Sequence, residues 1–108
     1  MTKEEMQSMA FMMIAHAGSA FDCFYRAVDL AEEARFEEAR TTMQTGKEEL
    51  NAAHRSQADL LSAEVRAEDI PFSIIMSHAQ DHLTMGIFME RMAEKLIRVY
   101  QKLEAGKE

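Results

Sequence analysis

Apolar residues recur at helical spacing along almost the whole chain, and two short stretches interrupt the pattern. The first interruption, near residues 32–36, contains neither Gly nor Pro. A single helix from residue 2 to residue 66 would be about 95 Å long, too long for this chain to cover with a core. We therefore predict a break there. The second interruption, residues 67–71, joins acidic residues to the only proline, which suits a helix start.

The pattern predicts three long helices. Thr2 followed by Glu5 is a capping-box pattern that marks the first helix start. The third helix is expected to reach about Leu103, followed by a frayed tail. The second has the heptad spacing of shallow-angle bundle packing, with a stripe of Phe36, Ala39, Met43, Gly46, Leu50, Ala53, Gln57 and Leu60. The predicted fold is all-α, one domain over residues 1–108, an antiparallel three-helix up-down-up bundle.

Charge and cysteine usage narrow the class of protein. The net charge of −7 argues against nucleic acid and against an anionic membrane surface as partners. The single cysteine, Cys23, excludes an internal disulfide framework and is expected to be a small buried thiol in a reducing compartment. No stretch resembles a signal peptide or a transmembrane span, so we expect a cytoplasmic protein. Gly18, in the middle of the first helix, is predicted to mark close helix packing.

The third helix carries more apolar surface than one bundle needs, since a helix at the surface of a monomer usually shows a single apolar stripe. One face holds Phe72, Met76, Leu83, Ile87 and Ile97. A second face holds Ile74, Ile75, Met85, Met89, Met92, Leu96, Val99 and Leu103, together with His78, Asp81 and His82. Two faces imply two contacts, and we predict that the polar-containing face meets other subunits around a central axis.

The residues with chemical potential are His78, Asp81 and His82. At about 100° per residue, His82 lies about 40° from His78 and Asp81 about 60° to its other side, so all three share one face. Spacing alone leaves three interpretations open. The histidines could hold a metal, His78 could accept a phosphoryl group while a neighbour steers its tautomer, or the residues could be polar insertions that fix register.

No Lys or Arg lies between Arg66 and Arg91. A phosphate at His78 would therefore depend on neutral donors such as Ser77, Gln80 or His82, on backbone N–H groups, or on a partner.

The remaining histidines lie on the first two helices. His16 and His54 are expected to be ordinary bundle or surface histidines. His54 with Gln57 is the better candidate for lining a cleft at His78. The methionines of the third helix are expected to pack, because thioether ligation belongs to copper chemistry and nothing else indicates copper.

The run Pro-Phe-Ser-Ile-Ile-Met-Ser-His-Ala-Gln-Asp-His-Leu at residues 71–83 resembles the signature of one protein family. It is the IIA component of the lactose/cellobiose (N,N′-diacetylchitobiose) branch of the bacterial phosphotransferase system. Residues 15–18, 34–39 and 51–57 also resemble the family, so the similarity covers nearly the whole chain. Two departures concern the scaffold. The family's first turn usually has a Gly where Arg35 stands, and position 16 is often aromatic where this chain has His16.

The resemblance implies a cytosolic three-helix bundle that forms a homotrimer of nine helices. It implies a phosphotransferase component that accepts a phosphoryl group on a histidine from the phosphorylated histidine of phospho-HPr. The group then passes to a cysteine of the IIB component, which phosphorylates the sugar as the membrane component IIC transports it. The sugar would be a β-linked disaccharide of the lactose, cellobiose or chitobiose type.

Mapped onto this sequence, the family implies that His78 is the phosphorylated histidine. His82 would be auxiliary or an alternative acceptor, and Gln80 a candidate phosphate contact. Asp81 would hold one divalent cation per trimer, expected to be Mg²⁺, on the three-fold axis. The main alternative is a non-enzymatic oligomeric bundle with a metal or polar core that acts as a structural or regulatory adaptor. A small metal-dependent enzyme is a third possibility, but the chain lacks the Glu-rich ligand set of di-iron bundles.

Overall fold

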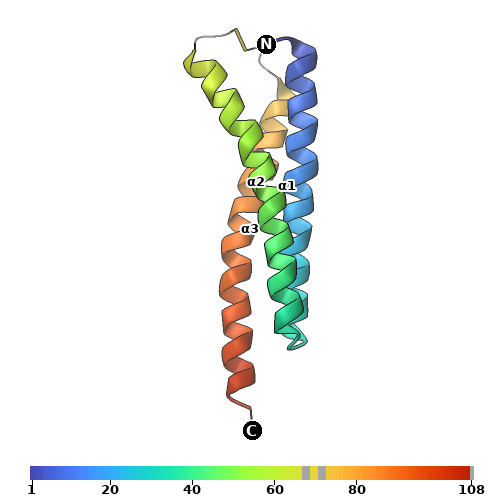
Figure 1. Cartoon of the computed structure of the whole chain (residues 1–108), viewed down its shortest axis with the longest axis vertical. Coiled ribbons are helices and arrows are strands. Elements are labelled where there is room, and N and C mark those ends of the chain that lie inside the picture. Colours follow the sequence, from blue (N-terminus) through green and yellow to red (C-terminus); the bar gives the residue numbers. More distant parts are fainter. Residues whose placement is uncertain (67–68, 71–72, 108) are drawn as a thin grey trace.

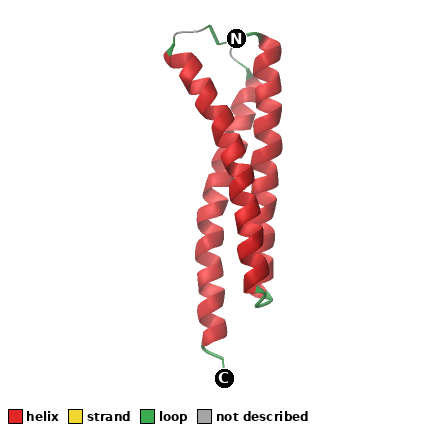
Figure 2. Ribbon diagram, in the orientation of Figure 1, coloured by secondary structure: helices red, strands yellow, loops and turns green. Residues whose placement is uncertain are grey.

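The computed structural model describes residues 1–66, 69–70 and 73–107. In that part of the chain the regular elements are three helices, α1 (Lys3–Glu32), α2 (Phe36–Val65) and α3 (Ile74–Ala105). Consecutive helices run antiparallel, so α1 and α3 share a direction, and α3 extends past the α1–α2 turn (Figure 1). The molecule is a rod of 62 × 20 × 19 Å without strands in the described residues (Figure 2). The predicted all-α three-helix bundle is confirmed.

The start of α1 has the predicted capping box. The Thr2 hydroxyl oxygen accepts a hydrogen bond from the Glu5 N–H at 3.1 Å, and the Thr2 N–H donates to the Glu5 carboxylate at 3.3 Å. Two backbone donors that the first turn would leave unpaired are thereby satisfied.

The break between α1 and α2 lies at residues 33–35, within the predicted stretch. Ala34 has a φ of 61° and is left-handed. Its N–H donates to Ala31 O and the Arg35 N–H donates to Leu30 O, both at 2.9 Å, which is the Schellman pattern of a helix end. Glycine usually takes this left-handed position. In this chain the left-handed position is therefore occupied by Ala34 and not by Arg35.

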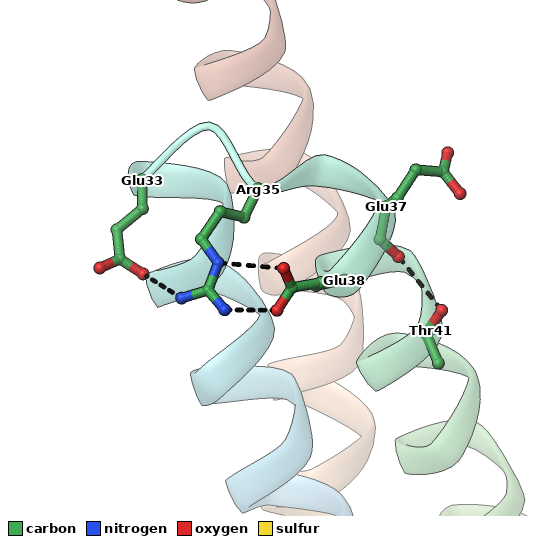
Figure 3. Close-up of polar contacts among 5 residues, drawn as sticks. All are labelled: Glu33, Arg35, Glu37, Glu38 and Thr41. Carbon is green, nitrogen blue, oxygen red and sulfur yellow. Dashed lines mark hydrogen bonds and ion pairs between the residues drawn. The ribbon is translucent and has the colours of Figure 1, made fainter.

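Arg35 stabilises the same turn from outside (Figure 3). Its guanidinium donates to both carboxylate oxygens of Glu38 and, at 3.3 Å, to Glu33. The hydrogen bond and charge of Glu38, followed by those of Glu33, raise the pKa of Arg35 above its usual value. The Thr41 hydroxyl donates to the Glu37 carbonyl oxygen one turn further along α2.

The second break separates Val65 from Ile74, as predicted. Residues 67–68 and 71–72, including Pro71 and Phe72, lie outside the described residues, so the expected role of proline at the helix start is untested. At the other end, α3 continues to Ala105, two residues past the expected end at Leu103. No helix within residues 1–66, 69–70 and 73–107 is long and apolar enough to cross a membrane.

The core lies along the predicted stripes. Phe24 is fully buried in α1, and the α2 stripe is buried from Ala39 to Leu60 apart from the half-buried Gln57. Cys23 is buried with a free thiol, as expected. Met76 and Leu83 are the large side chains of the buried face of α3. The face of α3 predicted to pack on the sister helices is therefore the one that does so.

One close contact between helices lies at Gly46, whereas Gly18 makes none. A Cβ added at Gly46 would lie 2.5 Å from Phe24 Cε1 and 3.0 Å from Cys23 Cβ. A Cβ added at Gly18 would meet nothing within 4 Å. The prediction of a close-packing role for Gly18 is therefore wrong for the single chain, because Gly18 lies beside the buried stripe of α1 and not within it.

Candidate functional site

The first turns of α3 place the polar residues on the outer face of the bundle. His78 and Asp81 are exposed and His82 is half-buried. Met76 and Leu83 anchor the opposite side of the same turns in the core. Because this side is held by packing, the outward direction of the polar face is fixed.

His78 and His82 are in direct contact. Their Nε2 atoms lie 3.1 Å apart within hydrogen-bond geometry, and the rings meet edge to face with centroids 4.6 Å apart and planes at 88°. One ring must donate and the other accept, because a neutral imidazole has one N–H and one lone pair. The one-turn spacing on α3 produces this contact.

Asp81 stands beside this pair on the same face. Its carboxylate is exposed to solvent. Exposed apolar side chains surround the polar residues along the outer face of α3, and Ile74 is 78% exposed and Phe88 64%. The others are Met85, Met92, Val99 and Leu103. The single chain therefore leaves uncovered only part of the face that was predicted to meet other subunits, because Ile75 and Met89 of that face are half-buried against the core.

Gln80 lies on another side of α3. Its amide oxygen accepts a hydrogen bond from Gln57 Nε2 at 3.1 Å, which ties α2 to α3. Around the helix it is about 160° from His78. Within one chain the structure thus brings His82, and not Gln80, to His78.

The other two histidines lie apart from this pair. His16 Nδ1 lies 2.7 Å from a Glu49 carboxylate oxygen and links α1 to α2, as a bundle histidine would. His54 is exposed on α2. The Gln57 expected to accompany it in lining a His78 cleft contacts Gln80 instead.

A metal site is not complete in one chain. Among the described residues, no group of three or more His, Cys, Asp or Glu side chains could hold a metal ion. Asp81 can offer a hard cation only one carboxylate per chain, and cations such as Mg²⁺ require several oxygen ligands. The donor set would fit such an ion only if further copies of the chain contributed their own carboxylates.

Comparison with known proteins gives the family. A family model described as the lactose/cellobiose-specific IIA subunit of the phosphotransferase system matches residues 8–101. The chain belongs to this family. It is thus a component of a sugar phosphotransferase system with a role in phosphoryl transfer, as the sequence resemblance implied.

Individual relatives agree with the family model. The lactose-specific EIIA component of Staphylococcus epidermidis is 33% identical over 102 residues, covering 94% of this chain and 98% of the relative. The lichenan-specific IIA component of Bacillus subtilis is 35% identical over 100 residues, covering 93% of this chain and 91% of the relative. The crystal structure of the cellobiose-specific enzyme IIA from Bacillus anthracis superposes with a TM-score of 0.93 at 34% identity. That superposition covers 99% of this chain and 96% of the other. The bundle described above is therefore the fold of the family.

Proposed function

We propose that the chain is a phosphocarrier whose His78 accepts a phosphoryl group from phospho-HPr and passes it to a cysteine of a IIB component. The observation that carries the proposal is the exposed imidazole of His78 on the outer face of α3, in contact with a second imidazole. A group that passes between proteins must travel through an accessible nucleophile, and a neutral imidazole nitrogen can serve as one.

Exposure also supports His78 over His82 as the acceptor. His82 follows one turn later and is half-buried, so an incoming phosphorus has less access to it. His16 is engaged by Glu49 between α1 and α2. His78 is therefore the acceptor in this proposal, and His82 is its auxiliary.

The surroundings of His78 suit a relay more than a hydrolase. Residues 67–90 contain no Lys or Arg, so this stretch supplies no cation to a phosphoryl group. The N–H groups available locally are those of His82 and of backbone amides, and the protein partners would supply most of the charge stabilisation. Transfer between two imidazoles and then to a thiolate would proceed in line, with little group-transfer free energy lost between acceptors.

The uncovered face of α3 supports assembly as a homotrimer of nine helices. Its exposed apolar side chains lie along the same helix face as His78 and Asp81, as is expected where a helix meets another subunit. Asp81 would lie within the interface, where carboxylates from three copies would repel one another. One divalent cation on the three-fold axis, Mg²⁺ by ligand chemistry, would offset that repulsion.

Substitution of Asp81 tests the metal and the trimer together. Asp81→Leu should keep the trimer and lose the bound metal. Light scattering measures the mass of the assembly, and elemental analysis measures its metal content. A wild-type mass equal to one chain at micromolar concentration would contradict the trimer, and unchanged metal content in the variant would contradict the role of Asp81.

The proposed partners are HPr as donor, IIB as acceptor and, through IIB, the membrane component IIC. Such a carrier would act in the cytoplasm. The relatives are named for lactose, lichenan and cellobiose, which supports a β-linked disaccharide as the transported sugar.

Incubation with phospho-HPr tests the function directly. The wild-type chain should gain one acid-labile phosphate by mass spectrometry and lose it when IIB is added, whereas His78→Ala should gain none. An oligomeric adaptor without catalytic function, which the apolar outer face of α3 would also suit, predicts no phosphate on the wild-type chain. Full labelling of His78→Ala would move the acceptor to another histidine.

A further inference from the structure

The contact between His78 and His82 joins the two tip nitrogens of the rings. Nε2 is the ring nitrogen farthest from the backbone, so it is the atom of an exposed His78 that an incoming phosphorus can reach. In this structure it lies 3.1 Å from Nε2 of His82. With both rings neutral, one hydrogen lies between these atoms, and the ring that carries it decides the chemistry of the pair.

Two arrangements are available. If His78 carries the hydrogen on Nε2, its exposed nitrogen has no lone pair and cannot attack phosphorus. If His82 carries it, the lone pair lies on His78 Nε2 and the proton of His78 lies on Nδ1. Neutral histidine in water intrinsically favours the proton on Nε2, so the competent form of His78 needs a donor that reverses this preference.

We propose that His82 is a positioning residue. Its Nε2–H donates to His78 Nε2 and holds His78 in the tautomer that can accept a phosphoryl group. This inference rests on the proposed role of His78 and adds which proton arrangement that role requires. As the phosphorus approaches, this N–H leaves the lone pair of His78 Nε2, which is then free to attack, and turns to a phosphoryl oxygen.

The position of His82 suits a fixed donor. It is half-buried, whereas His78 is exposed, so its ring is the more restrained of the two. It stands one turn after His78 on a helix whose other side is anchored by Met76 and Leu83. Residues 67–90 contain no Lys or Arg, and this N–H is a side-chain donor in direct contact with the nitrogen that would carry the phosphate.

The transfer step balances with this proton arrangement. The lone pair of His78 Nε2 forms the new N–P bond as the N–P bond of phospho-HPr breaks, and the bonding pair returns to the donor nitrogen. The proton on His78 Nδ1 stays in place during transfer and is then exchanged with water. His82 keeps its proton throughout and changes only the acceptor of its hydrogen bond, from a nitrogen lone pair to a phosphoryl oxygen.

Nitrogen NMR tests the tautomers without any substitution. Long-range ¹H–¹⁵N spectra of the full chain, at a pH where both rings are neutral, should show His78 protonated at Nδ1 and His82 protonated at Nε2. Protonated Nε2 on His78 would overturn the inference. In His82→Leu, His78 should revert to the Nε2–H form, and in His82→Gln, whose amide can also donate, it should keep the Nδ1–H form.

Transfer rates from phospho-HPr give the second readout. His82→Leu should be labelled about 10- to 100-fold more slowly, the loss expected when a hydrogen bond to a charged group is removed. His82→Gln should recover most of that rate, which a purely structural role would not predict. Unchanged labelling of His82→Leu, with wild-type His78 labelled normally, would refute this inference alone. Absence of phosphate from wild-type His78 would instead refute the proposed function.

Discussion

Replacing Ala34 with glycine should stabilise the protein, although the change removes a methyl group. Ala34 ends α1 with a φ of 61°, and two backbone hydrogen bonds fix it there. A side chain in this conformation brings Cβ against the following carbonyl oxygen, which glycine avoids. Ala34 is exposed, so the lost methyl group removes no core packing.

The expected magnitude follows from two opposing terms. The left-handed conformation costs an L-residue about 1–2 kcal/mol. Glycine avoids that cost but loses about 0.5–1 kcal/mol more than alanine through the greater freedom of its unfolded chain. With mid-range values of both terms, the net gain in the free energy of unfolding should be about 0.5–1 kcal/mol. For a chain of this size the melting temperature should rise by roughly 2–8 °C.

Urea and thermal unfolding, followed by far-ultraviolet circular dichroism at one fixed protein concentration, measure the effect. Fixed concentration is needed because assembly would link stability to concentration. Ala58→Gly is the matched control, since Ala58 is exposed within α2 and should lose about 1 kcal/mol there. Destabilisation of both variants by similar amounts would refute the left-handed turn at Ala34.

Two further predictions concern packing and a surface hydrogen bond. Gly46→Ala should lower the free energy of unfolding by about 1–3 kcal/mol, because its Cβ would collide with the buried Phe24 ring. Gly18→Ala should be neutral or stabilising by up to about 1 kcal/mol. Equal effects of the two substitutions in unfolding experiments would contradict the difference between the two glycines. The Tyr100 hydroxyl donates to Glu32 at 3.1 Å, and that bond and the charge of Glu32 raise the pKa of Tyr100. The hydrogen bond therefore stabilises the folded protein fully at pH values below the ordinary tyrosine pKa. This stabilisation is lost as the pH rises through the raised pKa of Tyr100. Absorbance titration of a Tyr25→Phe variant should show this raised pKa of Tyr100, and adding Glu32→Gln should lower it. An unchanged titration curve after Glu32→Gln would contradict the role of Glu32.

Helix geometry explains how much of the fold and of the site could be predicted. Apolar periodicity depends only on local spacing, so the three helices and the buried stripe of α2 follow from the sequence. The shared face of His78 and His82 follows from the same rotation per residue, and their contact is an i,i+4 pair.

Contacts between helices could not be predicted in this way, because they depend on how far one helix slides along another. The bonds from Gln57 to Gln80 and from His16 to Glu49 are of this kind. The same limit explains the error at Gly18. A glycine in a helix can be found in the sequence, but whether a ring such as Phe24 packs against it depends on the register of the helix pair. The Ala34 turn could be expected near residues 32–36, yet without a glycine no residue marked the left-handed position.

Site-resolved mass spectrometry after incubation with phospho-HPr tests the central claim most directly. Since residues 67–90 contain no Lys or Arg, trypsin should release residues 67–91 as one peptide that holds both His78 and His82 and neither of the other histidines. Fragmentation that preserves phosphohistidine should then place the phosphate on His78. Phosphate on His82, or none on this peptide, would contradict the account.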